Sequence, residues 1–151
     1  MKRAVPGTFG VGMLLAVGLL IWGAGQPEQA LSENPCSLQT LKGTYVYHCA
    51  GVQPVNGQQV HFAFAGQDNY NGDGTMTGTY SFSDNGALSQ NVSYADTYTV
   101  NPDCTGTLLS VDENGLIGHF DLFFGHDGEE VSFVQTDPGV VAAGVERRVR
   151  K

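Results

Sequence analysis

The chain has 151 residues, and its 15 acidic side chains outnumber its 7 lysines and arginines, giving a formal net charge of −8 at pH 7. A chain this acidic is repelled by nucleic acid and by anionic membrane surfaces. The composition therefore argues against proteins that recognise polyanions, and it leaves open both enzymes and binding proteins.

The first 25 residues have the pattern of a secretory signal peptide. Lys2 and Arg3 provide a positive start, and residues 11–22 are almost wholly apolar. Small residues at 23–25 offer a cleavage site, with cleavage as late as residue 30 as a second option. A retained membrane anchor is the alternative, but the apolar run is shorter than the roughly 20 residues that such an anchor needs. We expect a secreted or periplasmic protein with no nucleic-acid partner and no membrane association after signal removal.

Removal of residues 1–25 leaves five cations against 15 acids, a net charge of −10. The remaining length is enough for one domain with a buried core. Residues 26–42 contain few apolar positions and are expected to form an N-terminal arm. The folded domain is expected at 43–148, followed by a short basic tail at 149–151.

From residue 43 onward, apolar and β-branched runs are interrupted at short intervals by turn-forming residues. At 98–107, for example, Asn101, Pro102 and Asp103 separate two such runs. We predict eight strands, at residues 43–50, 58–69, 75–83, 88–100, 104–111, 116–124, 130–136 and 140–148.

Short connections make consecutive strands antiparallel neighbours. A meander of such strands would leave two exposed edges, and closure into a barrel removes both. The sequence therefore predicts an all-β fold, an eight-stranded antiparallel up-and-down barrel, with a two-sheet β-sandwich as the alternative.

Alternation along the strands assigns aromatic side chains to the inside of the barrel and mainly Thr and Ser to the outside. The inward aromatic residues are the candidate ligand-binding residues: Tyr45, Tyr47, Phe62, Phe64, Tyr80, Phe82, Tyr94, Tyr98 and Phe120. They either line a pocket for a small hydrophobic molecule, open at the end away from the N-terminal arm, or simply fill a small barrel.

Asp96 is in register with Tyr94 and Tyr98, on the inward face. A carboxylate inside an apolar barrel must be hydrogen-bonded, paired or functional. A β-bulge in the same strand would instead turn it outward. If it points inward, Asp96 is the best candidate for a catalytic general base.

Three cysteines in an exported protein imply one disulfide and one remaining thiol. Cys36 precedes the first strand, and the turn before Cys104 returns to the same end of the barrel, whereas Cys49 lies near the other end. We therefore predict a Cys36–Cys104 disulfide, because the two Cα atoms must come within about 7 Å. Cys49 is expected to be a buried, unreactive thiol.

Two histidines raise the question of a metal site. If Cys49 pairs with Val60, then His48 and His61 face each other on the outside of the barrel. A zinc site needs at least a third protein ligand, and none is predicted nearby. We expect neither a metal nor a cofactor.

Three segments carry a resemblance to known proteins: LKGTYVY at 41–47, YTVNPDCTGTL at 98–108 and VQTDPGVVAAGVERR at 134–148. They resemble a group of small, exported, largely uncharacterised bacterial proteins, which are similar in outline to calycin and allene-oxide-cyclase-like barrels. The resemblance covers nearly all of residues 36–148 and implies an eight-stranded, calycin-like barrel with an apolar interior. No catalytic motif is carried over, and no lipocalin G-x-W is present.

The leading functional prediction is a secreted β-barrel protein that binds a small hydrophobic ligand in its interior without catalysis. One alternative is an isomerase or cyclase that folds a hydrophobic substrate inside the barrel, with Asp96 and a tyrosine as acid–base groups. The other is a structural or surface-interaction protein whose aromatic residues leave no cavity.

Overall fold

The computed structural model describes residues 34–150. The predicted signal peptide and residues 26–33 of the predicted arm lie outside these residues. In the described part of the chain, no helix is long and apolar enough to span a membrane.

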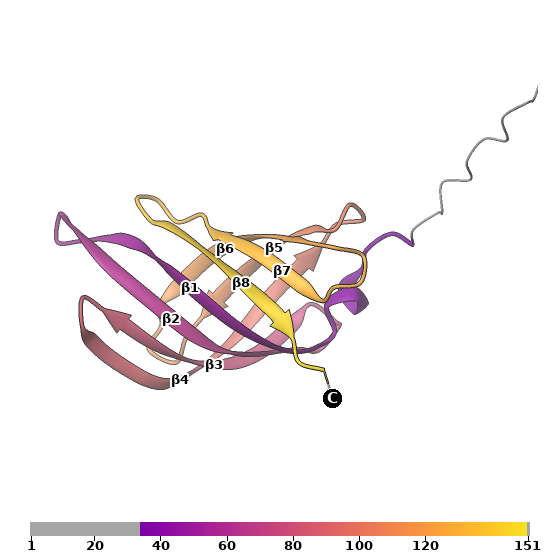
Figure 1. Cartoon of the computed structure of the whole chain (residues 1–151), viewed down its shortest axis with the longest axis horizontal. Coiled ribbons are helices and arrows are strands. Elements are labelled where there is room, and N and C mark those ends of the chain that lie inside the picture. Colours follow the sequence, from indigo (N-terminus) through magenta and orange to yellow (C-terminus); the bar gives the residue numbers. More distant parts are fainter. Residues whose placement is uncertain (1–33, 151) are drawn as a thin grey trace, which may run out of the picture. The chain divides into compact units, whose positions relative to one another are not determined.

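The described residues form a closed β-barrel preceded by one turn of 3-10 helix, η1 (Leu38–Leu41). The strands are β1 (Gly43–Val55), β2 (Gln58–Tyr70), β3 (Thr75–Asp84), β4 (Ala87–Val100), β5 (Thr105–Val111), β6 (Ile117–Phe124), β7 (Glu130–Gln135) and β8 (Val141–Arg148). Each strand pairs antiparallel with the next, and β8 pairs with β1. Figure 1 shows the β1–β2, β3–β4 and β7–β8 hairpins at one end of the barrel and η1 at the other. The predicted up-and-down barrel is confirmed, and the sandwich is excluded.

Strand β1 is longer than predicted. We expected it to end at residue 50, with a loop at 51–57, but it continues to Val55. Asn56 and Gly57 alone make the turn, with φ angles of 50° and 78° that these two residue types tolerate. Pro54 fits within the strand because β1 has no β8 partner beyond Val52, so one side of β1 is an edge there.

The longer hairpin changes the pairing register of the two histidines. Cys49 pairs with Phe64 rather than with Val60, so His48 lies opposite Ala65 and His61 opposite Val52. The predicted juxtaposition of His48 and His61 is therefore wrong, because the tight turn fixes a different register.

The end of the barrel nearest η1 is closed by buried side chains. Leu41 and Tyr45 have no exposed surface. The Tyr45 hydroxyl donates a hydrogen bond to the Gly128 carbonyl oxygen at 2.5 Å. The Arg148 guanidinium lies 4.9 Å from the Tyr45 ring centroid and donates to main-chain carbonyl oxygens, including that of Thr40 at 2.7 Å. The positive charge of Arg148 is thus held at the closed end.

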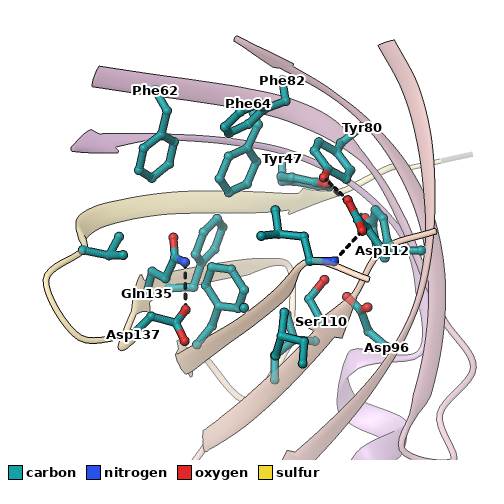
Figure 2. Close-up of a pocket in the computed structure, with 18 of the residues that line it drawn as sticks. Tyr47, Phe62, Phe64, Tyr80, Phe82, Asp96, Ser110, Asp112, Gln135 and Asp137 are labelled. Atoms are coloured by element: carbon teal, nitrogen blue, oxygen red, sulfur yellow. Dashed lines mark hydrogen bonds between the residues drawn. The ribbon is translucent and has the colours of Figure 1, made fainter. Parts of the chain in front are cut away.

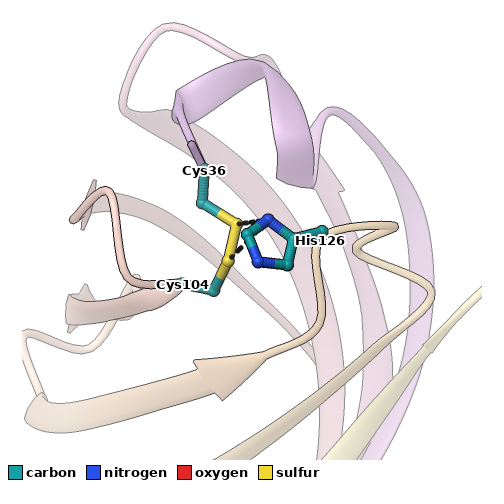
Figure 3. A group of neighbouring side chains, drawn as sticks. All are labelled: Cys36, Cys104 and His126. Carbon is teal, nitrogen blue, oxygen red and sulfur yellow. Dashed lines mark hydrogen bonds between the residues drawn. A yellow bond between two sulfur atoms is a disulfide. The ribbon is translucent and has the colours of Figure 1, made fainter. Parts of the chain in front are cut away.

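A disulfide ties the N-terminal segment to this closed end. Cys36 and Cys104 are joined, with their Cα atoms 5.1 Å apart, as the sequence predicts. The Cys36 amide also donates a hydrogen bond to the Pro102 carbonyl oxygen at 3.1 Å. Figure 3 shows the ring of His126 beside the two sulfur atoms. Cys49 is the free cysteine of the described residues, and it is buried.

Candidate ligand-binding site

The barrel encloses a cavity of about 350 Å³. It opens at the end away from η1, since its lining includes residues of the β5–β6 and β7–β8 connections. Seven of the nine predicted aromatic residues line it: Tyr47, Phe62, Phe64, Tyr80, Phe82, Tyr94 and Phe120. The interior is therefore partly open rather than filled.

The other two predicted ligand-binding residues, Tyr45 and Tyr98, do not line the cavity. Both belong to the closed end. The Gly72 amide donates to the Tyr98 hydroxyl at 3.1 Å, and that hydroxyl donates to the Leu38 carbonyl oxygen at 3.2 Å. Alternation along the strands could not separate Tyr45 and Tyr98 from the cavity-lining residues, because all of them point to the inside of the barrel.

Strands β2 and β3 supply an aromatic wall, which Figure 2 shows along one side of the cavity. The rings of Phe62 and Phe64 stack with centroids 5.9 Å apart and an interplanar angle of 2°. Phe82 stacks on Phe62 at 5.9 Å, and Tyr80 meets Phe64 edge-on at 6.1 Å. Such mutual packing holds the rings in fixed positions around the open space.

Two glycines at inward positions make room for tyrosine side chains. A Cβ atom on Gly66 would lie 2.8 Å from the Tyr47 hydroxyl oxygen, and one on Gly78 would overlap the Tyr94 ring. Both contacts are closer than a methyl group tolerates. Gly66 and Gly78 therefore allow the two tyrosines to cross the barrel.

Deep in the cavity lie three buried acidic residues from three different strands. Asp68 on β2, Asp96 on β4 and Glu146 on β8 are 2 %, 4 % and 3 % exposed, and all three line the cavity. None of the described residues lining the cavity is a lysine, arginine or histidine. The inner end of the cavity is thus acidic, with no basic side chain among its walls.

Sequence reasoning identified Asp96 but missed Asp68 and Glu146. Asp68 has the same parity as Phe62 and Phe64, so strict alternation along β2 would have placed it inside. The alternation that would have placed Glu146 inside is weaker on β8, because the preceding inward residues are Ala142 and Gly144 rather than large apolar side chains.

Tyrosine hydroxyls and a shared proton hold the deepest carboxyl groups. Tyr70 donates to Glu146 Oε2 at 2.9 Å, and Tyr94 donates to Asp68 Oδ1. The Tyr47 and Tyr94 hydroxyl oxygens are 3.1 Å apart. Asp68 and Glu146 also hydrogen-bond to each other, which requires a proton on one of the two carboxyl groups.

Burial is the main reason that these acids hold protons more tightly than usual. It raises the pKa of Asp68 to about 7, although the hydrogen bond from Tyr94 acts in the opposite direction. The pKa of Glu146 is raised well above its usual value by burial and by the negative charge of Asp68. Two carboxyl groups this close and this buried do not ionise together, so the pair keeps at least one proton at neutral pH.

Asp96 stands apart from that pair and has a structural role. The ladder between β4 and β5 runs from Thr97 to Val100 on the β4 side, and an isolated bridge pairs Tyr94 with Asp112. Between these two pairings the Asp96 carboxyl group takes the place of a ladder bond, accepting a hydrogen bond from the Val111 amide at 2.9 Å and another from Ser110. Burial raises its pKa to about 6.

A bulge does occur in β4, but it does not turn Asp96 outward. Tyr80 pairs with Val92 while Phe82 pairs with Ser89, so β4 carries one extra residue in this interval, where Asn91 has a φ of 54°. The bulge precedes Asp96, which keeps the inward parity of Tyr94. The inward placement on which its functional interpretation depends is therefore present.

The mouth of the cavity combines apolar and polar residues. Leu116 and Ile117 are 62 % and 54 % exposed. Asp112 accepts a hydrogen bond from the Tyr80 hydroxyl at 2.9 Å, and Asp137 accepts one from Gln135 at 2.8 Å. Figure 2 shows both of these bonds. The polar groups at the mouth are engaged with one another, which leaves apolar side chains at the entrance.

A second cluster consists of Cys36, Cys104 and His126. Their sulfur and imidazole nitrogen atoms lie within 4.8 Å of one another, which among the described residues is the one arrangement of three such side chains close enough to hold a metal ion. The two sulfur atoms are bonded to each other, so neither is a thiolate. This cluster is a disulfide with a neighbouring imidazole (Figure 3).

Comparisons with known proteins support the fold but identify no family. Neither a scan against family models nor a search of the curated proteins gives a match. Among solved structures, a de novo designed fluorescence-activating β-barrel aligns with a TM-score of 0.52 and 12 % identity, covering 74 % of this chain and 96 % of that one.

A redesigned barrel, mFAP1, bound to DFHBI, gives a TM-score of 0.52 and 14 % identity over 74 % of this chain and 98 % of that one. A further redesigned β-barrel aligns with a TM-score of 0.50 and 15 % identity, covering 76 % of this chain and 96 % of that one. At these identities the similarity is one of architecture.

Proposed function

We propose that this protein is exported and binds a small, largely hydrophobic molecule inside its barrel. The observation that carries the proposal is the cavity of about 350 Å³, open at one end and walled by aromatic rings. Ligand sites in proteins typically measure about 300–1,000 Å³ and combine apolar walls with a few polar groups. The signal-peptide pattern of residues 1–25 supports export.

Architecture alone offers weaker support. One of the similar barrels is described as bound to DFHBI, a small ligand, so a barrel of this outline accommodates a guest in that protein. A side-chain-filled core, the basis of the structural or surface-interaction alternative, would leave no such space.

The test uses the chain from residue 26 and the uncharged fluorescent probe N-phenyl-1-naphthylamine. Val140 lines the cavity near its mouth, whereas its neighbour Val141 is 71 % exposed. We expect the unmodified protein and Val141→Trp to bind the probe at one site, and Val140→Trp to bind it at least about tenfold more weakly because the indole occupies the cavity. Equal binding by both variants would show that the probe sits on the surface and would refute the proposal.

A second candidate is an isomerase or cyclase, favoured by the position of Asp96 in the cavity with a pKa raised to about 6. A base with that pKa is largely ionised at neutral pH and still able to accept a proton. If the protein converts a hydrophobic substrate, Asp96→Asn should abolish turnover while circular dichroism shows a folded barrel. Unchanged turnover would remove Asp96 from the mechanism.

A further inference from the structure

We propose that the cavity selects hydrophobic molecules carrying one protonated amine, which the carboxyl groups of Asp68 and Glu146 bind at its inner end. The inference rests on the proposed function, because it names the ligand class for the same cavity.

Among the described residues, the buried acidic pair has no basic side chain as its counter-charge in the cavity. Asp68 and Glu146 are 2 % and 3 % exposed, and no described basic side chain lines the cavity with them. Arg148 also points inward on β8, but it is engaged with Tyr45 and carbonyl oxygens at the closed end. Buried carboxyl groups need a proton or a cation as partner. In the empty cavity a proton fills that role, and a ligand ammonium group can replace it.

Aromatic groups surround the acidic pair. The Tyr94 hydroxyl contacts Asp68, and the Tyr47 hydroxyl lies 3.1 Å from that of Tyr94. The Tyr47 ring in turn packs edge-on against Phe64, with centroids 5.9 Å apart. Aromatic faces attract cations, most strongly where water is excluded. An ammonium group here would have carboxylate oxygens and π faces as neighbours.

The polarity of the cavity walls changes from the mouth to the inner end. Its mouth carries the exposed apolar residues Leu116 and Ile117, its middle carries the phenylalanine wall, and its depth carries the acids. A molecule with an apolar body and one terminal ammonium group matches this order. A carboxylate ligand in the same orientation would place negative charge against Asp68 and Glu146.

Binding is then an exchange of one cation for one proton. The ammonium group donates hydrogen bonds to the two carboxylates, and the proton that Asp68 and Glu146 share leaves to solvent. No covalent bond other than this O–H bond changes. The titratable groups facing the pair are Tyr45 and Tyr47 from β1, Tyr70 from β2, and Tyr94 and Asp96 from β4.

The direction of the pH dependence follows. The pKa values of Tyr47, Tyr70 and Tyr94 are raised, so these tyrosines stay neutral from pH 6 to 8. Asp96 becomes more negative across the same range. Since Asp68 gives up its proton near pH 7 in the empty protein, amine affinity should rise from pH 6 to pH 8.

The experiment compares three ligands of nearly equal shape and different charge: 2-naphthylmethylamine, 2-naphthylmethanol and 2-naphthoate. Each competes with N-phenyl-1-naphthylamine for the chain from residue 26, and calorimetry in phosphate and in Tris counts the protons released. We expect the amine to bind about tenfold more tightly than the alcohol at pH 7.5, since charge-assisted hydrogen bonds are the stronger ones. Naphthoate should bind least, and only the amine should release a proton.

Matched variants assign the effect to the acids. Asp68→Asn should remove the preference for amine over alcohol while the alcohol still binds, and Glu146→Gln serves the same purpose if the first variant does not fold. Asp121→Asn, on the outer face of β6, removes one charge elsewhere and should keep the preference.

The outcomes separate the two proposals. If none of the three molecules binds and the probe is not bound either, the proposed function fails. If the alcohol binds as tightly as the amine and no proton is released, ligand binding stands and the selection for amines is refuted.

Discussion

At the scale of single residues, the notable feature is that ionisable side chains occupy positions where alternation leads one to expect apolar ones. Asp68, Asp96 and Glu146 share the inward parity of the aromatic residues. Each is accommodated by hydrogen bonds: Asp68 and Glu146 by tyrosines and by each other, Asp96 by Val111 and Ser110. Such groups weaken the isolated fold, and we propose that they give the cavity its selectivity for ligands.

The thiol of Cys49 provides a first prediction. It is 2 % exposed, and burial raises its pKa to about 12, so the reactive thiolate is scarce at pH 8. We expect iodoacetamide to leave Cys49 unmodified in the folded protein and to alkylate it fully in guanidinium chloride, as measured by intact mass. Rapid alkylation of the folded protein would contradict the buried placement.

The close approach of the Tyr94 ring to Gly78 provides a second prediction. A methyl group there would overlap the Tyr94 ring, so Gly78→Ala must displace Tyr94 from Asp68. We expect the free energy of unfolding in urea to fall by roughly 1–3 kcal/mol, the usual range for overpacking. Thr77→Ala, at the adjacent exposed position of β3, is the control and should change it by less than about 0.5 kcal/mol.

At the scale of elements, the closed end depends on segments distant in sequence. The disulfide joins residues separated by 68 positions and holds the segment before η1 against the β4–β5 turn. Tyr45 and Arg148 connect β1 and β8 to the β6–β7 connection through Gly128. Closure at this end leaves the opposite end as the route into the cavity.

A third prediction concerns this disulfide. Replacing Cys36 and Cys104 together by serine should lower the free energy of unfolding by about 4 kcal/mol, because the unfolded chain regains the freedom of a long loop. Urea denaturation of the variant and of the oxidised protein measures the difference. A loss below about 1 kcal/mol would mean that η1 and Arg148 hold the closed end without the disulfide.

At the scale of the whole molecule, the buried acids set the pH dependence of stability. Asp68 and Asp96 have folded-state pKa values of about 7 and 6, above the ordinary aspartate value of 3.8. The folded state therefore binds more protons than the unfolded state between about pH 4 and pH 7. Their contribution is fully present below the unfolded pKa and is lost as pH rises through the folded pKa values.

The fourth prediction is a ligand-free melting temperature that is highest near pH 4 and falls by roughly 5–10 °C by pH 8. Thermal scans by circular dichroism at constant ionic strength would measure it. Asp68→Asn should flatten the profile, because the asparagine side chain does not titrate. A melting temperature that rises steadily from pH 5 to pH 8 would show that these carboxyl groups are not buried as described.

Local pattern determined much of this architecture. Turn residues and period-two alternation predicted the strands, and short connections predicted an antiparallel meander, because both signals depend only on neighbours in the chain. The Cys36–Cys104 pair followed from knowing which end of the barrel each turn occupies. The inward parity of the seven cavity-lining aromatic residues was available from the same alternation.

Tertiary structure alone decided what depends on register and on depth. The Asn56-Gly57 turn extended β1 and separated His48 from His61, and the depth of each inward residue divided Tyr45 and Tyr98 from the cavity walls. Convergence of β2, β4 and β8 brought Asp68, Asp96 and Glu146 into one space. Alternation along a strand predicts which face of the sheet a side chain occupies. Closing the sheet decides what lies across from it, and so decides whether an inward acid meets a cation, a proton or an empty site.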